Sequence, residues 1–546
     1  MSAKYFSIAN GPQFQSLMYR PLYWFGGNGD VTLNENLSLA LPPQYSPDGS
    51  SVTITLKNYM WSDGRPVTTR DLQFWQNLVS ANKAIWAAYS PGEYPDNVTG
   101  MTINGPTSIT FTLSQAYGSY FFTYNELSQI TPLPQHVWDK ESVNGAVGDY
   151  DMTPAGAEAV YKFLDAQASS LSTYGSNSLW QVVNGPWRLK FFDTRGRVKM
   201  VPNAMYSGPV KPTLTEFDEV PFTQDTTEFN LLKGGASGVN AVDYGYLPAA
   251  DAPQKDALMG LGYRVEPWTG WTIHFIAENY ANPATGSIFN QLYFRQAMQE
   301  LIDQRTFIDR AYGGYAYPTY GPVPLKPSSR FVDSFQQSNP YPYDPGMAVS
   351  LLRAHGWKVE PGGTSTCLTP GTGANLCGSG VAAGAQASFK VDYPSGQTAL
   401  DAEMAQLKTD YARAGINISL HSAPLNSIFS DDAPCMAGQP CTWDMLVSAW
   451  TYAPDYYPTG DELWATGAGA NLNSFSDPTM DQLIANTEKS NDLSALYAYQ
   501  DYAARQLPVM WTPTPYFQLN AINNQLRGTD PFDPLIQIYP ENWHWS

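Results

Sequence analysis

A strand followed by a tight turn and a capped helix constrains the fold more than any other segment of this sequence. From Ser51 to Lys57 apolar and polar residues alternate, which is the period of a half-buried strand. The next residues, "WSDGRPVTTRD", contain an Asp-Gly turn dipeptide, and Thr68 with Asp71 forms the pattern of a capping box. The pattern therefore predicts a strand, a turn and a helix that begins near Thr69.

In the second half of the chain, segments with the sequence pattern of a strand alternate with segments that have the pattern of a helix. "ASFKVDYPSG" has the composition of a strand, "TALDAEMAQLKTDYARAG" that of a helix ended by glycine, and "INISLHS" that of a further strand. A strand, a helix and a strand in this order favour parallel pairing. The fold class that we predict is therefore α/β.

The length and net charge of the chain limit the kinds of partner that it can bind. The chain has 546 residues, enough for three or four domains at roughly 150 residues each. Its formal net charge is −19, and no run of Lys or Arg offers a basic patch, so nucleic acid is not expected as a partner. No stretch reaches the roughly 18 consecutive apolar residues of a membrane span. We expect a soluble chain from which a signal peptide is absent.

The cysteines form two local pairs in Gly/Pro-rich loops. "CLTPGTGANLC" holds Cys367 and Cys377, and "CMAGQPC" holds Cys435 and Cys441. Neither spacing is that of a zinc knuckle or a redox CxxC site. Three pairings are possible, and proximity favours 367–377 and 435–441 in an oxidising, extracellular compartment. The alternative is four free thiols in a cytosolic protein.

Motifs for catalysis and cofactors are mostly absent. The sequence has no HExxH, no GxxxxGK[ST] and no GxSxG, and no two of its five histidines are close enough in sequence to suggest a metal pair. We therefore expect neither a metal nor a cofactor. A Ser/His/Asp triad stays open, because its members meet only in space.

Aromatic residues provide the positive signal. The chain contains 16 Trp and 35 Tyr, and many occur in turn-rich segments such as "PWTGWTIHF", "SAWTYAPDYYPTG" and "DELWATGAGANLNSF". Rigid rings on loops supply contact area for a ligand at little entropic cost. Any single ring could instead pack a domain interface, but the group favours a ligand cleft.

Taken together, these segments resemble the extracellular solute-binding proteins of ABC importers, in the peptide/nickel-binding class. "WSDGRPVTTRDLQFW" is similar to the most recognisable motif of that class. The resemblance continues in "NGPWRLKFF", "YFRQAMQELIDQRTFIDRAYGGYAYPTYGPVP", "YDPGMAVSLLRAHGW", "WDMLVSAWTYAPDYYPTG" and "YAYQDYAARQLPVMWTPTPYF". These segments extend over nearly the whole chain in the order of the family.

The resemblance implies a two-lobed clamshell of the type II periplasmic-binding-protein kind with an additional small domain. It would be a monomer, in the periplasm or lipid-anchored on the outer face of the membrane, that closes on a solute, delivers it to an ABC permease and catalyses no reaction. The first lobe would comprise residues 1–45, 185–265 and 510–546, the extra domain residues 46–184, and the other lobe residues 266–509.

The resemblance also implies ligand-binding positions. Peptide binders of the class carry an Asp three residues after the Trp of a W-x-x-D stretch, and here that stretch runs from Trp450 through Tyr452 to Ala453. Alanine cannot pair with an ammonium group, and Asp455 is the nearest substitute. The remaining expected positions are Trp268, Thr269, Gly270 and Trp271, which match the stretch between the lobes, and Asn471.

Three functions are compatible with these residues. The first is a receptor for oligopeptides. The second keeps the fold but binds an oligosaccharide or another neutral polar solute, as the missing Asp and the abundance of Trp would suit. The third is a secreted carbohydrate-active enzyme that uses two carboxylates as acid and base.

Overall fold

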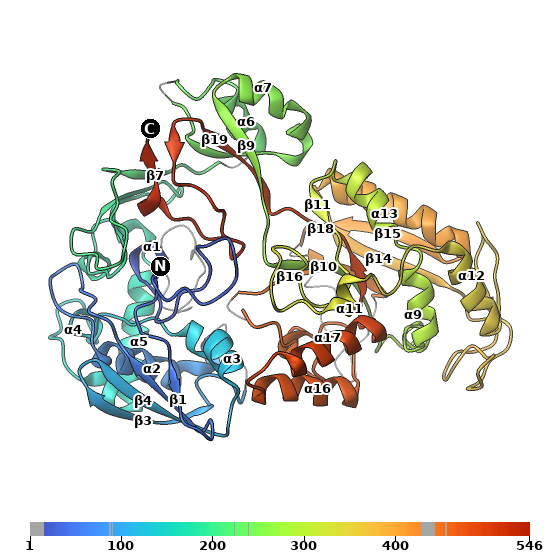
Figure 1. Ribbon diagram of the computed structural model, residues 1–546, viewed down its shortest axis with the longest axis horizontal. Helices are drawn as coiled ribbons and strands as arrows, with labels where there is room; N and C mark the ends of the chain where they lie inside the picture. The colour runs from blue at the N-terminus through green and yellow to red at the C-terminus, as the bar shows by residue number, and fades with distance from the viewer. Residues whose placement is uncertain are drawn as a thin grey trace.

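The computed structural model describes residues 16–546 except 87–88, 90, 223, 239, 426, 429–442 and 454–455. Figure 1 shows two bodies side by side, one with the N-terminal half of the chain and the chain's end, the other with most of the second half. The mixed α/β class predicted from the sequence is confirmed. No helix among the described residues is both long and apolar enough to cross a membrane.

An antiparallel four-stranded sheet begins the first body. Its strands lie in the order β1, β2, β4, β3. In β2 every second residue is buried, as the alternating sequence predicted, and Val52 pairs with Phe111 across the sheet. Helices α2 and α5 pack against each other beside this sheet. The strands are β1 (Gln44–Tyr45), β2 (Ser51–Thr55), β3 (Val98–Gly105) and β4 (Ser108–Leu113), and the helices are α2 (Thr69–Asn82) and α5 (Pro154–Ala168).

The turn after β2 is built around the carboxylate of Asp71. Helix α2 begins at Thr69, and the predicted capping box is present, with the Thr68 N–H donating to Asp71 at 2.8 Å. The same carboxylate accepts the indole N–H of Trp61 at 3.3 Å and the backbone N–H of Gln135 at 3.1 Å. One carboxylate thus joins the turn, the helix start and a distant loop, which is why a strand ends here and a helix follows.

Three smaller sheets complete the first body. One of them joins the middle of the chain to its C-terminal part, because β19 pairs with β8 on one side and β9 on the other. Another pairs β20 with β21, both near the chain end. The strands are β5 (Trp187–Phe192), β6 (Val198–Pro202) and β7 (Phe217–Glu219) in one sheet, β8 (Tyr244–Leu247), β9 (Tyr263–Trp268) and β19 (Gln518–Asn523) in the next, and β20 (Leu526–Arg527) with β21 (His544–Trp545).

A five-stranded mixed sheet forms the centre of the second body. Its order is β15, β14, β16, β10, β17. The predicted strand-helix-strand unit is confirmed, since β14 and β15 pair in parallel and α13 connects them. The strands are β10 (Thr272–Glu278), β14 (Ser388–Pro394), β15 (Asn417–Ala423), β16 (Met445–Thr451) and β17 (Met510–Thr512), with two short pairs, β11 (Ala316–Tyr317) with β18 (Thr514–Pro515) and β12 (Trp357–Lys358) with β13 (Thr366–Cys367).

The remaining α-helices have between 3 and 14 residues, and most belong to the second body. Asp344 caps α12 by accepting the Met347 N–H at 3.0 Å, as its place before Pro345 predicted. These helices are α1 (Ser16–Met18), α3 (Ser119–Phe121), α4 (Gln135–Trp138), α6 (Asp225–Leu232), α7 (Lys255–Gly260), α8 (Gly286–Phe289), α9 (Leu292–Gln299), α10 (Gln304–Thr306), α11 (Ser334–Gln337), α12 (Pro345–Ala354), α13 (Thr398–Tyr411), α15 (Asp461–Trp464), α16 (Pro478–Lys489) and α17 (Ser494–Gln506).

One of the two expected disulfides is present. Cys367 and Cys377 are bonded, and they close a loop of the segment that follows the short strand β12. Both sulfur-bearing residues are buried although the loop around them is largely exposed. The other expected pair, Cys435 and Cys441, lies outside the described residues.

Candidate functional site

Two short segments carry the chain between the two bodies. The first connects β9 to β10 through residues 269–271, and the second connects β18 to β19 through Tyr516 and Phe517. They run side by side, because the Phe517 N–H donates to the Trp268 carbonyl at 2.8 Å. The stretch from Trp268 to Trp271, expected from the sequence to lie between the lobes, is therefore one of the two crossing segments, which we call the crossing stretch (Figure 1).

Trp268 ends β9 and is anchored to the C-terminal part of the chain. Its indole N–H donates to the Asp533 carbonyl at 2.6 Å, and its ring packs against Phe517 and Phe532 at 5.4 and 5.8 Å between centroids. Thr269 is half-buried, and the Gly270 carbonyl accepts the Tyr317 hydroxyl at 3.0 Å. These contacts fix the start of the crossing stretch against both bodies.

Trp271 ends the crossing stretch and is completely buried. Its backbone N–H donates to the Pro534 carbonyl at 2.7 Å, and its own carbonyl accepts the Tyr452 N–H at 3.0 Å. The indole N–H of Trp271 has no hydrogen-bond partner among the described residues. Tyr452 is buried beside it and donates its hydroxyl to the Pro322 carbonyl. Trp271 and Tyr452 therefore join the crossing stretch to the segment that follows β16.

Trp450 lines a cavity of about 280 Å³ on one face of the five-stranded sheet. Phe275 and Ala277 of β10 line it together with their cross-strand partners Ser448 and Leu446 of β16. The segment from α15 to Asn473 lies over this face and supplies the ring of Trp464. The other lining residues are Ala449, Leu463, Gly469, Ala470, Leu472, Asn473 and Val509.

The chemistry of this cavity is apolar. None of the described residues that line it has an ionisable side chain, and two of them are tryptophans. An aromatic, apolar cavity of this kind accepts an aliphatic or aromatic group, and the hydroxyl of Ser448 and the amide of Asn473 are its polar features.

Asn471 supports the cavity but does not line it. Its side-chain amide donates to the carbonyls of Ala465 and Phe475 at 2.9 and 2.8 Å, and its oxygen accepts the Phe475 N–H at 3.1 Å. These bonds hold in shape the loop whose residues Ala470 and Leu472 contact the cavity. Asn471 therefore holds this loop in place beside the cavity.

The structure thus brings Trp450 and Asn471 to one cavity and places the crossing stretch beside Tyr452. Asp455, the expected substitute for the missing anchor, lies outside the described residues, and Ala453 is exposed. Sequence reasoning missed Phe275 and Leu446, and although it noted Trp464 as a loop aromatic, it did not join it to Trp450. The usable signal for Phe275 was its place in "GWTIHF", a strand directly after the crossing stretch.

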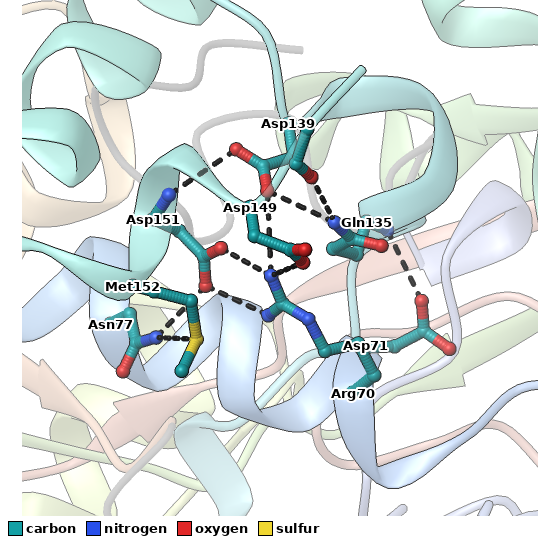
Figure 2. Close-up of polar contacts among 9 residues, drawn as sticks. Arg70, Asp71, Asn77, Gln135, Asp139, Asp149, Asp151 and Met152 are labelled. Atoms are coloured by element: carbon teal, nitrogen blue, oxygen red, sulfur yellow. Dashed lines mark hydrogen bonds and ion pairs between the residues drawn. The ribbon is translucent and has the colours of Figure 1, made fainter.

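A cluster of three carboxylates elsewhere in the first body is close enough together for a metal site, but an arginine side chain already occupies the space between them. Asp139, Asp149 and Asp151 are the sole group of three or more His, Cys, Asp or Glu residues, among those the structure describes, whose side chains lie close enough together to hold a metal ion. The Arg70 guanidinium lies among them, donating to Asp151 at 2.8 Å and Asp149 at 3.0 Å (Figure 2). This group binds α2 to the loop before α5 and holds a guanidinium where a metal would need space.

Comparisons with known proteins agree on one family. The model of the bacterial extracellular solute-binding proteins, family 5 Middle, matches residues 36–471. Protein XP55 of Streptomyces lividans is 23% identical over 401 residues, or 72% of this chain and 60% of that protein. The periplasmic oligopeptide-binding protein OppA of Salmonella typhimurium is 22% identical over 496 residues, which are 89% of this chain and 80% of OppA.

A solved structure supports the same fold. The oligopeptide-binding protein AppA from Bacillus subtilis, in complex with a nonapeptide, superposes with a TM-score of 0.67 at 16% identity over 100% of this chain and 96% of AppA. At this identity the likeness shows the fold, a two-lobed type II binding protein.

Proposed function

The chain belongs to the bacterial extracellular solute-binding proteins of family 5, and we propose that it captures an oligopeptide between two lobes and delivers it to an ABC permease in the membrane. The family and its fold are those of substrate-binding proteins, so we propose that the chain itself catalyses no reaction. The observation that carries the proposal is an aromatic, apolar cavity next to the segments that join two bodies.

We propose the division into lobes expected from the sequence, residues 1–45 with 185–265 and the C-terminal part, against residues from 266 onward, with residues 46–184 as the extra domain. The strand pairing supports two adjustments. The first crossing lies at 269–271, because β9 still pairs with β19. The last lies at 516–517, because β17 and β18 pair with strands of the second lobe.

The composition of the cavity supports a ligand peptide that carries an apolar side chain. The described residues that line the cavity carry no charge, and two tryptophan rings form part of its wall. A leucine-like or phenylalanine-like side chain would bury its surface there at about 25 cal/mol for each Å² removed from water. We propose Trp450 as the ring that contacts this side chain, and Tyr452 with the crossing stretch as the residues that couple the contact to movement of the lobes.

Mass spectrometry of material released from the purified protein under denaturing conditions tests the ligand class. Recovery of peptides enriched in apolar side chains is the expected result. Recovery of glycans alone would reject the peptide and favour the neutral-solute alternative.

A matched pair of variants tests the site. Trp450→Ala should weaken binding of the identified peptide by about 2 kcal/mol, or roughly 30-fold in Kd. Trp545→Ala is the control, because Trp545 is 50% exposed at the end of the chain in β21. Equal affinity of the two variants in calorimetry, with both folded, would reject Trp450 as a ligand contact.

A further inference from the structure

The two lobes also touch far from the crossing stretch, at the end of α16. The Gly118 N–H donates to the Glu488 carbonyl at 2.7 Å, and the Ser119 N–H donates to the Asn491 side chain at 2.8 Å. A Cβ on Gly118 would lie 2.1 Å from the Ser490 carbonyl oxygen. Figure 1 shows α3 directly beside α16 at this point. The backbones of the extra domain and the second lobe are therefore in direct contact.

A second pair of bonds makes this contact specific. Asn125 donates its amide N–H to the Tyr457 carbonyl at 3.0 Å and accepts the Tyr457 N–H at 2.9 Å, and both residues are buried. The rings of Tyr120 and Tyr457 stack at 5.7 Å. The Arg330 guanidinium lies 5.0 Å above the Tyr120 ring. Such reciprocal bonding between segments 332 residues apart in sequence requires one defined arrangement of the two lobes.

Carboxyl groups from both lobes meet at the same contact. Glu93 and Glu126 come from the extra domain, and Asp461 and Glu488 come from the second lobe. Glu126 is 1% exposed, and its carboxylate accepts the Tyr94 N–H at 2.9 Å. Among the described residues, the groups that interact electrostatically with these four carboxyls include Glu462, Tyr45, Tyr94, Tyr499 and the cation Lys489.

This clustering changes the protonation of the carboxyls. Burial, and then the charge of Asp461, raises the pKa of Glu93 to about 10. Burial raises the pKa of Glu126 to about 8 and that of Glu488 to about 7, with Asp461 adding to both. Separated lobes would take the charges of Asp461 and Glu488 away from Glu93 and Glu126, and the pKa of both carboxyls would fall. The contact state thus binds more protons than the separated state.

We propose that this contact, formed by residues 118–126 with 456–461 and 488–491, is a proton-linked latch that holds the closed form and releases as the pH rises. The proposal rests on the proposed clamshell movement. By linkage, the ratio of closed to open form falls about tenfold per pH unit for each carboxyl that must take up a proton. Acid therefore favours the closed form, and alkaline conditions favour opening.

Small-angle scattering of the ligand-free full chain tests the latch. The radius of gyration should increase between about pH 5 and about pH 9, while far-UV circular dichroism stays constant. The double variant Glu93→Gln/Glu488→Gln, at two half-buried positions, should stay compact to higher pH with a shallower transition. Glu403→Gln is the control, since Glu403 is a buried carboxyl that contacts Tyr312 within the second lobe.

Gly118→Ala provides an independent variant, because its methyl group clashes with Ser490 and should keep the lobes apart at every pH. A wild-type radius that does not change with pH, a double variant with the wild-type profile, or a compact Gly118→Ala protein would each overturn the latch. The mass spectrometry of the released ligand is a separate test. If peptides are recovered but the radius of gyration does not change with pH, the latch alone is rejected. If the radius changes with pH but no peptide is recovered, only the proposed ligand is rejected.

Discussion

The two tryptophans of the crossing stretch differ in a way that substitution can measure. The Trp268 indole N–H donates to the Asp533 carbonyl at 2.6 Å, whereas the Trp271 indole N–H has no partner among the described residues. The side chains are 2% and 0% exposed, respectively. Phenylalanine keeps an aromatic ring at either position and removes the N–H. We predict that Trp268→Phe destabilises the protein more than Trp271→Phe.

The size of the difference in unfolding free energy follows from what each indole N–H contributes to stability. Both substitutions lose similar ring volume in a buried place, so this cost largely cancels between them. Trp268→Phe also removes one hydrogen bond to the Asp533 carbonyl, which keeps the Ile536 N–H as a donor, and this loss costs about 1 kcal/mol. Trp271→Phe removes a buried donor that forms no bond, which relieves about 1 kcal/mol or more of desolvation. The expected difference is therefore about 2 kcal/mol or more.

Urea unfolding followed by circular dichroism measures the difference. Because a chain of several domains need not unfold in one step, the comparison uses the transition that both substitutions shift. Trp271→Phe with a midpoint equal to or below that of Trp268→Phe would refute the reasoning. Trp271→Ala is a further check, since loss of a completely buried ring should cost about 3–5 kcal/mol.

Three other predictions follow from single contacts. Asp71→Ala removes the acceptor of three N–H groups and should cost about 3 kcal/mol or more in urea unfolding, whereas an effect below about 1 kcal/mol would contradict its role. Replacing Cys367 and Cys377 by serine opens a short loop and should cost about 2–3 kcal/mol, while unchanged thermal unfolding would count against this. Burial raises the pKa of Glu403 to about 8 from 4.5, so the folded state retains a proton that the unfolded state loses between these values. Stability is therefore lost as the pH rises through that window, and the melting temperature of Glu403→Gln should exceed that of wild type increasingly toward pH 8; a constant difference would reject the assignment.

Local chemistry made part of the fold predictable. The start of α2 depends on residues within four positions of each other, and the capping pattern of Thr68 and Asp71 located it. The parallel unit from β14 to β15 could also be predicted. In one continuous segment the spacing of apolar residues changes from every second residue to every third or fourth and back again. The bond from the Gln135 N–H to Asp71 could not be predicted, because the loop that contains Gln135 meets Asp71 only in the folded chain.

The cavity was beyond prediction for the same reason. Phe275 and Ser448 are far apart in sequence, and they share a cavity only because β10 and β16 pair antiparallel in one particular register. A shift of one residue would turn Trp450 to the other face of the sheet. The aromatic composition of the loops predicted the kind of site, but the register that assembles it is a property of the whole sheet.

The cavity, the crossing stretch and the proposed latch share one part of the chain. Trp450 lines the cavity, Tyr452 bonds to the Trp271 carbonyl, and Tyr457 pairs with Asn125 of the opposite lobe. Because the cavity lies within one lobe, an apolar side chain can enter it before the lobes meet. Under the proposed function, a shift of Trp450 would act on the crossing stretch through the bond from the Tyr452 N–H to the Trp271 carbonyl. The proposal therefore couples ligand capture to closure through Tyr452 and the crossing stretch, which carries the chain between the lobes.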